Sequence, residues 1–165
     1  MVVLCEVGTR PMPERPSILI VEARFYESIA DQLIEGAIKS LDKAGYLYER
    51  LEVPGVFEVP AAIRMAICSL ETGYTPNVYA GLLALGCVIR GETSHYDYVC
   101  RESARALMDL ATNNSLAMGF GILTCENMEQ ARVRANIHEK NKGGEAALAC
   151  LRMIEVKRHF RLFQK

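Results

Sequence analysis

Four strand-like segments alternate with amphipathic helical patterns along this chain, and this alternation constrains the fold more than any other feature. Residues 18–21 are a continuous apolar run, as in a strand buried on both faces of a sheet. Residues 78–89, an apolar stretch interrupted by Gly81 and Gly86, give the strongest strand signal. Residues 46–53 and 116–124 predict two further strands. The expected helices are one that ends near Gly45, one that begins near Pro60 and ends near Gly73, and three that cover about residues 95–111, 128–135 and 142–157.

Strands that alternate with helices form a parallel sheet through right-handed crossovers, with helices on both faces. The expected fold class is therefore α/β, a three-layer α/β/α sandwich around a four-stranded parallel sheet. Ligands of such sheets bind beyond the carboxyl ends of the strands. The loops at residues 22–27, 53–60, 86–95 and 124–127 are the expected binding region.

Length and composition narrow the class of protein. The chain has 165 residues, which suits one domain; prolines among charges at residues 1–16 predict a flexible Pro-rich N-terminal arm, and residues 17–165 are expected to form a single domain. A formal net charge of -1 argues against binding nucleic acid by bulk charge, and the longest apolar run is too short to span a membrane. The six cysteines lack CxxC spacing and zinc-type clustering, and the N-terminus has no apolar signal core. We expect a cytoplasmic protein with reduced thiols and no metal site.

The chain contains no GxGxxG, GxxxxGK[ST], GxSxG or HExxH motif, so dinucleotide-binding, P-loop, hydrolase and zinc-protease functions have no support in the sequence.

The candidate residues of the strand-end loops each have a functional or an ordinary structural explanation. The loop after the third strand opens a helix whose N-terminus can bind phosphate, and the dipole there favours a neutral His95 suited to act as a base. Ser94 with Asp97 is more simply a helix cap. Phe25 is a stacking platform or a core aromatic, and Phe57 just before a helix suits a hydrophobic staple.

Five motifs in one order give a more specific signal than any of these residues alone. In chain order they are Ala23-Arg-Phe-Tyr26, Val53-Pro-Gly-Val-Phe-Glu-Val-Pro60, Ala84-Leu-Gly-Cys-Val-Ile-Arg-Gly-Glu-Thr-Ser-His-Tyr-Asp-Tyr-Val99, Gly121-Ile-Leu-Thr124 with Glu129-Gln-Ala131, and Asn141-Lys-Gly143 with Glu145-Ala-Ala147. With these motifs the chain resembles the 6,7-dimethyl-8-ribityllumazine synthase family over about residues 18–156. The resemblance implies a flavodoxin-like form of the sandwich.

The resemblance also implies an enzyme, a transferase of riboflavin biosynthesis. The family condenses 5-amino-6-ribitylaminouracil with 3,4-dihydroxy-2-butanone 4-phosphate to give 6,7-dimethyl-8-ribityllumazine, phosphate and water, with no cofactor or metal. By this resemblance His95 transfers protons and Phe25 stacks on the pyrimidine ring. Val56, Phe57 and Glu58 would form the loop that holds the ribityl chain. Cys87, Val88 and Ile89 would form the strand end that meets the uracil edge, and Gly91, Glu92 and Thr93 would form the loop on the phosphate side. A neighbouring subunit would present Phe120, Arg134 and Lys142, with Arg134 on the phosphate.

The resemblance finally implies a ring of five subunits with active sites at the subunit interfaces, which some members pack into a 60-subunit icosahedral shell. Residues 136–140 lack the glycine that is usual in shell-forming members, which favours a free homopentamer. The chain departs from the family pattern at Tyr26, where Asn is common, and at Cys125, where Thr is common. Two other functions stay open: a non-catalytic lumazine or flavin binder, disfavoured by His95 and Arg134, and a flavodoxin-like electron carrier, which rests on fold analogy alone.

Overall fold

The computed structural model describes residues 17–72 and 78–162 of the chain. The predicted N-terminal arm at residues 1–16 and the predicted helix end at Gly73 lie outside these ranges.

Within the described residues, four strands form one parallel sheet in the order β2-β1-β3-β4. They are β1 (Ser17–Ala23), β2 (Leu47–Val53), β3 (Tyr79–Ile89) and β4 (Met118–Cys125). β1 and β3 are the central strands and are almost wholly buried, which is why their sequences read as apolar runs. The predicted α/β class with a four-stranded parallel sheet is confirmed.

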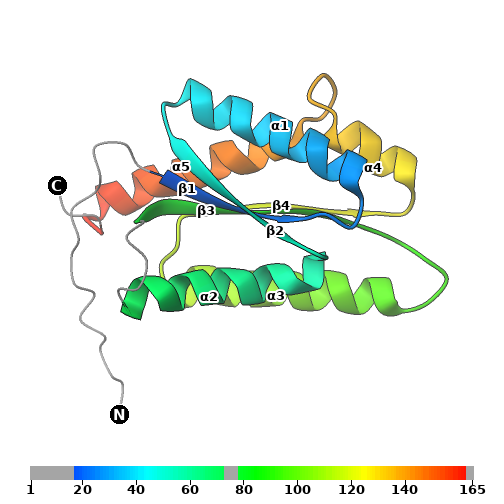
Figure 1. Ribbon diagram of the computed structural model, residues 1–165, viewed down its shortest axis with the longest axis horizontal. Coiled ribbons are helices and arrows are strands. Elements are labelled where there is room, and N and C mark those ends of the chain that lie inside the picture. The colour runs from blue at the N-terminus through cyan, green and yellow to red at the C-terminus, as the bar shows by residue number, and fades with distance from the viewer. Residues whose placement is uncertain (1–16, 73–77, 163–165) are drawn as a thin grey trace, which may run out of the picture.

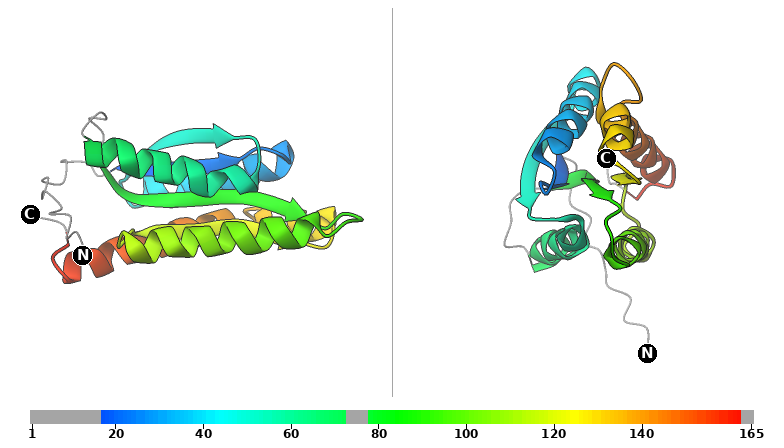
Figure 2. Two further views of the ribbon diagram at one scale, coloured as in Figure 1. Left: turned by 90° about the horizontal axis from the view of Figure 1, so that it is seen from below. Right: turned by 90° about the vertical axis from the view of Figure 1, so that its right-hand side faces the viewer.

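Helices cover both faces of this sheet and complete the predicted three-layer sandwich (Figure 1). Viewed end on in Figure 2, the sheet separates two helical layers. One layer contains α1 (Glu27–Lys43), α4 (Met128–Ala135) and α5 (Lys142–His159), and the other contains α2 (Val59–Thr72) and α3 (His95–Asn113).

Alternation along the central strands divides the core into two parts. On β1, Ile20 belongs to the apolar cluster beneath α1 and α5, whereas Val21 belongs to the cluster beneath α2 and α3. On β3, Leu83 and Ala84 divide in the same way. The sheet is therefore buried from both sides. No helix within residues 17–72 and 78–162 is long and apolar enough to cross a membrane.

Two helix ends are fixed by residues that the sequence singles out. Gly45 follows α1 with a φ of +76°, a left-handed conformation that glycine adopts without strain. At the start of α4, the Asn127 side chain accepts a hydrogen bond from the Gln130 backbone N–H at 2.9 Å, as predicted. The Gln130 side chain in turn accepts from the Glu126 N–H at 3.0 Å, one residue earlier than a capping box requires.

The predicted cap by Ser94 and Asp97 at the start of α3 is wrong. Ser94 has φ and ψ of -69° and -2°, and its side chain makes no capping hydrogen bond. A capping side chain needs extended φ and ψ at this position to reach the free N–H groups. Asp97 instead accepts hydrogen bonds from the guanidinium of Arg90 at 3.1 and 3.3 Å.

The connection between α4 and α5 makes its left-handed turn without glycine. No residue of segment 136–140 has a positive φ, and the left-handed residue is Asn141, with a φ of 42°. Its side chain accepts a hydrogen bond from the Gly144 N–H at 3.1 Å and so caps α5. Asn is among the few side chains that tolerate this conformation.

Candidate active site

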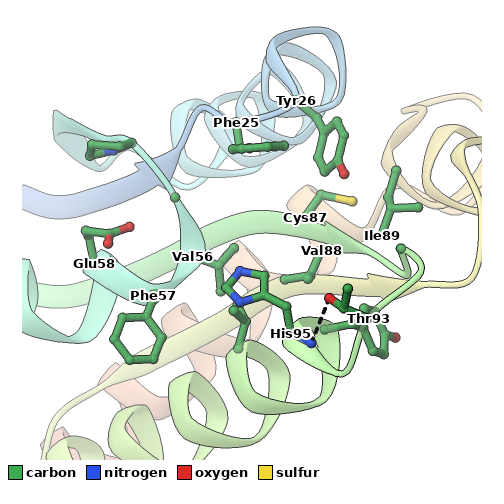
Figure 3. A pocket seen from close by; sticks show the side chains of 15 residues that line it. Phe25, Tyr26, Val56, Phe57, Glu58, Cys87, Val88, Ile89, Thr93 and His95 are labelled. Atoms are coloured by element: carbon green, nitrogen blue, oxygen red, sulfur yellow. Dashed lines mark hydrogen bonds between the residues drawn. The ribbon is translucent and has the colours of Figure 1, made fainter.

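A cavity of about 440 Å³ lies at the carboxyl end of the sheet, where β1 and β3 end and one turn of 3-10 helix, η1 (Val56–Glu58), follows β2. This volume is within the range of small-molecule sites. Figure 3 shows side chains from three loops that are far apart in the sequence. The lining residues are Phe25, Tyr26, Pro54, Gly55, Val56, Phe57, Glu58, Cys87, Val88, Ile89, Gly91, Thr93, His95, Tyr96 and Val99.

Phe25 and Tyr26 form one wall of the pocket, in the turn between β1 and α1 (Figure 3). Their rings meet edge to face, with centroids 4.9 Å apart and an interplanar angle of 73°. Tyr26 is partly buried against the core, and this burial raises the pKa of its hydroxyl, which therefore stays protonated at neutral pH. Phe25 is 72% exposed. A flat, exposed ring beside a fixed neighbour is suited to stack on a planar ligand.

The turn η1 forms a second wall and is held close to the sheet by a glycine. A Cβ at Gly86 would lie 2.7 Å from Val56 Cγ2 and 2.9 Å from the Cβ of Ala23. Gly86 thus allows the buried Val56 to pack directly on the end of β3. The next residue, Phe57, is 58% exposed and lines the pocket, so it does not act as a buried hydrophobic staple.

His95 is the first residue of α3 and lies across the pocket from Phe25 (Figure 3). Its backbone N–H donates a hydrogen bond to Thr93 Oγ1 at 3.4 Å. The side chain is exposed, and within the part of the chain that the structure describes its imidazole has no hydrogen-bond partner. Both ring nitrogens are therefore available to a bound ligand, as proton transfer requires.

Cys87 lines the pocket but is not built as a nucleophile. Burial raises the pKa of its thiol to about 12, so the thiol is protonated at neutral pH. The end of β3 therefore offers backbone groups rather than a reactive sulfur. Among the described residues no group of three or more His, Cys, Asp or Glu side chains is placed to hold a metal ion.

Arg90 and Tyr96 fix the edge of the pocket beside His95. The Arg90 guanidinium lies 4.1 Å from the centroid of the Tyr96 ring, within cation–π range. It also binds Asp97, and its Nε donates to Glu126 at 2.9 Å. These contacts join the end of β3, the first turn of α3 and the loop after β4.

The structure brings together the predicted residues of the first three loops. Every one of them lines the pocket except Glu92, which is exposed between two lining residues. The three residues predicted to come from a neighbouring subunit lie elsewhere in this chain: Phe120 on β4, Arg134 on α4, and Lys142 at the start of α5. Arg134 Nη1 donates only to a backbone carbonyl, that of Gln130 at 3.0 Å, and Arg134 has no carboxylate partner among the described residues.

Sequence reasoning assigned no substrate contact to five residues that line the pocket, although all five lie within the motifs of the family resemblance. Each is adjacent, directly or within a few positions, to a residue that was assigned a role, so proximity along a strand-end loop is the signal that would have found them. They are Tyr26, Pro54, Gly55, Tyr96 and Val99.

Comparison with known proteins gives one consistent family. The family model described as 6,7-dimethyl-8-ribityllumazine synthase matches residues 15–158. Proteins named 6,7-dimethyl-8-ribityllumazine synthase are similar in sequence: one from Rhizobium meliloti (designated 1) is 57% identical over 85% of this chain and 90% of its own length. One from Agrobacterium fabrum is 54% identical over 87% and 96%, and one from Bartonella tribocorum is 51% identical over 92% and 96%.

Proposed function

Because the chain belongs to the 6,7-dimethyl-8-ribityllumazine synthase family, we propose that the pocket at the carboxyl end of its sheet is where its two substrates react. The protein is a transferase of riboflavin biosynthesis. It condenses 5-amino-6-ribitylaminouracil with 3,4-dihydroxy-2-butanone 4-phosphate to give 6,7-dimethyl-8-ribityllumazine, phosphate and water. One observation carries the assignment of the site: three loops distant in sequence converge on one cavity, with Phe25 and His95 on opposite sides.

The pyrimidine substrate binds along the Phe25 side of the pocket. Its ring stacks on the exposed face of Phe25, and its uracil edge meets the backbone at the end of β3. The ribityl chain lies along η1, where the Glu58 carboxylate accepts hydrogen bonds from its hydroxyl groups.

His95 moves protons during the condensation. Imine formation needs a proton taken from the attacking amine and given to the departing water, and phosphate elimination needs a proton taken from carbon. The imidazole is exposed and has no hydrogen-bond partner among the described residues, so both ring nitrogens are free to take part in these transfers. Holding the two substrates in one orientation supplies much of the remaining rate enhancement.

The phosphate lies at the loop of residues 91–93, beside the start of α3. The side chain of Ser94 does not cap this helix terminus, and the positive end of the helix dipole suits an anion. Arg134 of a neighbouring subunit completes the phosphate site. Its guanidinium has no carboxylate partner in the described part of the chain, so its charge is available, unlike that of Arg132, which binds Glu129 and Glu139.

The active form is a ring of five subunits, with each site shared between neighbours. This accounts for why Phe120, Arg134 and Lys142 lie away from the pocket of their own chain. Such a head-to-tail contact joins two different surfaces and closes after a fixed number of copies. The protein works in the cytoplasm, where its cysteines stay reduced; the five cysteines among the described residues are all free thiols.

A turnover assay tests this function directly. The purified protein is mixed with both substrates, and formation of the lumazine is followed by its absorbance against the same mixture without protein. We expect multiple turnovers per subunit. Tight binding of the lumazine or a flavin without turnover would instead support a ligand-binding protein on the same scaffold.

A further inference from the structure

One buried carboxylate lies outside the pocket and has no role in the proposed chemistry. Glu22 is at the end of β1 and is only 1% exposed, and it is the one acidic or basic side chain buried within the described residues. A charge in such a place is stable only with close partners.

Two arginines supply those partners. Glu22 Oε1 accepts a hydrogen bond from Arg50 Nε on β2 at 2.6 Å, and Oε2 accepts from Arg24 Nη1 at 3.2 Å. Arg24 Nη2 also donates to Asp31 on α1 at 2.8 Å, a bond that raises the pKa of Arg24. Glu22 therefore connects β1 to β2 and, through Arg24, to α1.

Arg24 directly precedes Phe25, the exposed ring of the pocket. Because Phe25 is 72% exposed, its own packing does little to fix it. Its place depends on the flanking backbone: Arg24 N–H donates to the Val53 carbonyl at 3.0 Å, and the Tyr26 carbonyl accepts from the first turn of α1. The side chain of Arg24, bound to Glu22 and Asp31, is a further anchor on this turn, beside the partly buried ring of Tyr26.

We propose that Glu22 is a positioning residue that, by holding Arg24, keeps Phe25 oriented to receive the pyrimidine ring. Glu22 touches neither substrate. Its effect is confined to the end of the pocket that Phe25 forms, and the phosphate end is built from other loops. The proposal rests on the function proposed above for Phe25.

The first test measures the KM of each substrate in Glu22→Gln. A glutamine keeps the shape but loses the charge that attracts both arginines. We expect the KM for the aminouracil to rise about 10-fold, the effect of losing one aromatic stacking contact, and the KM for the butanone phosphate to change less than about twofold. Glu22→Asp keeps the charge and should recover part of the loss. Glu35→Gln is the control, since it removes an exposed pair with Lys39 on α1.

A double-mutant cycle separates positioning from general damage. In Phe25→Ala there is no ring to orient, so adding Glu22→Gln should raise the KM for the aminouracil no further. Full additivity of the two effects would overturn the proposal while leaving the stacking role of Phe25 intact. If Phe25→Ala alone leaves this KM unchanged, the proposed function of Phe25 is wrong and the role of Glu22 is overturned with it.

Arg24→Met keeps the test decisive if Glu22→Gln folds poorly. It leaves the bond between Glu22 and Arg50 in place and removes the side-chain bonds that Arg24 makes to Glu22 and to Asp31. The same selective rise in the KM for the aminouracil is expected. An unchanged KM in folded Arg24→Met would overturn the proposal.

Discussion

His95 lines the pocket with an imidazole that no described residue engages, so its removal should act on chemistry rather than on folding. We predict that His95→Ala lowers turnover about 10- to 100-fold, at the low end of the range for acid–base catalysis, because an amine and a ketone phosphate also condense unaided. The measurement is kcat from lumazine absorbance. His159→Ala, an exposed histidine at the end of α5, is the matched control. Unchanged kcat in folded His95→Ala would contradict the role.

Arg134 and Arg132 lie on the same short helix but differ in their partners. Arg132 forms ion pairs with Glu129 and Glu139, whereas Arg134 donates a hydrogen bond to a backbone carbonyl. We predict that Arg134→Ala raises the KM for the butanone phosphate about 10- to 100-fold, the effect of losing one charged hydrogen bond of roughly 1.5–3 kcal/mol. Arg132→Ala should leave this KM nearly unchanged. Equal losses for both substrates in Arg134→Ala would show that the arginine does not act on the phosphate.

Pocket residues can be predicted from the sequence when the residues around them belong to the same chain. Phe25, Phe57 and His95 each follow a strand end, and parallel strands place their carboxyl ends at one edge of the sheet, which brings these residues together. Tyr26 and Tyr96 lie within the predicted motifs but were given no substrate contact, and Tyr26 was singled out only because Asn is common there. No single-chain pattern can place Arg134, because its proposed partner surface belongs to another copy.

At the scale of elements, α5 packs on α1 and β4 through glycines that allow backbone-to-backbone approach. A Cβ at Gly143 would overlap the carbonyl oxygen of Leu33 on α1, and one at Gly119 would overlap the carbonyl oxygen of Ala146 on α5. These contacts also place Asn141 and Lys142 at the start of α5. The position of α5 therefore depends on Gly143 and Gly119 having no side chain.

We predict that Gly143→Ala destabilises the protein even though alanine favours helices. Propensity alone would stabilise α5 by about 1 kcal/mol, but overpacking against Leu33 costs about 1–3 kcal/mol and exceeds it. The measurement is the midpoint of urea unfolding, with all variants at one protein concentration because assembly contributes to stability. Gly91→Ala is the control, since a Cβ there meets nothing within 4 Å. A midpoint equal to or above that of the parent would contradict the close approach.

Elements themselves are well predicted from the sequence, and their ends less so. The apolar runs of β1 and β3 and the helical spacing of α1 follow directly from burial, which is visible as periodicity. The cap at Ser94 was wrongly predicted because residue types do not reveal φ and ψ. Asn127 has the extended backbone that a capping residue needs, and the cap predicted there from its residue type is confirmed.

At the scale of the whole molecule, both edges of the sheet expose apolar side chains. On β2, Leu47 and Leu51 are exposed, and on β4 the ring of Phe120 is 49% exposed. Two different apolar edges on one chain suit a head-to-tail ring, in which one edge of each copy meets the other edge of the next. The same contact between sheet edges would bring Phe120 on β4 close to the pocket of the next copy.

We predict a free pentamer in solution, with a mass of about 92 kDa for five copies of an 18.4 kDa chain, measured by light scattering coupled to size exclusion. The reason is the absence of glycine at residues 136–140, although Asn141 shows that a left-handed turn forms here without one. A mass near sixty chains would show that this segment permits a shell. Neither mass shows whether two neighbouring subunits share each active site, so that question needs a separate test.

Complementation tests whether each site is shared. His95→Ala and Arg134→Ala chains are each impaired, but a mixed ring contains interfaces at which an intact His95 faces an intact Arg134 of the neighbouring copy. Unfolding and refolding the two variants together should therefore give more activity than the sum of the variants refolded apart, in the proportion expected for random mixing. Activity equal to that sum would mean that both residues serve a site within one chain, or that Arg134 serves none. That result would also remove the mechanistic reason for the ring, because a complete site within one chain would need no neighbour.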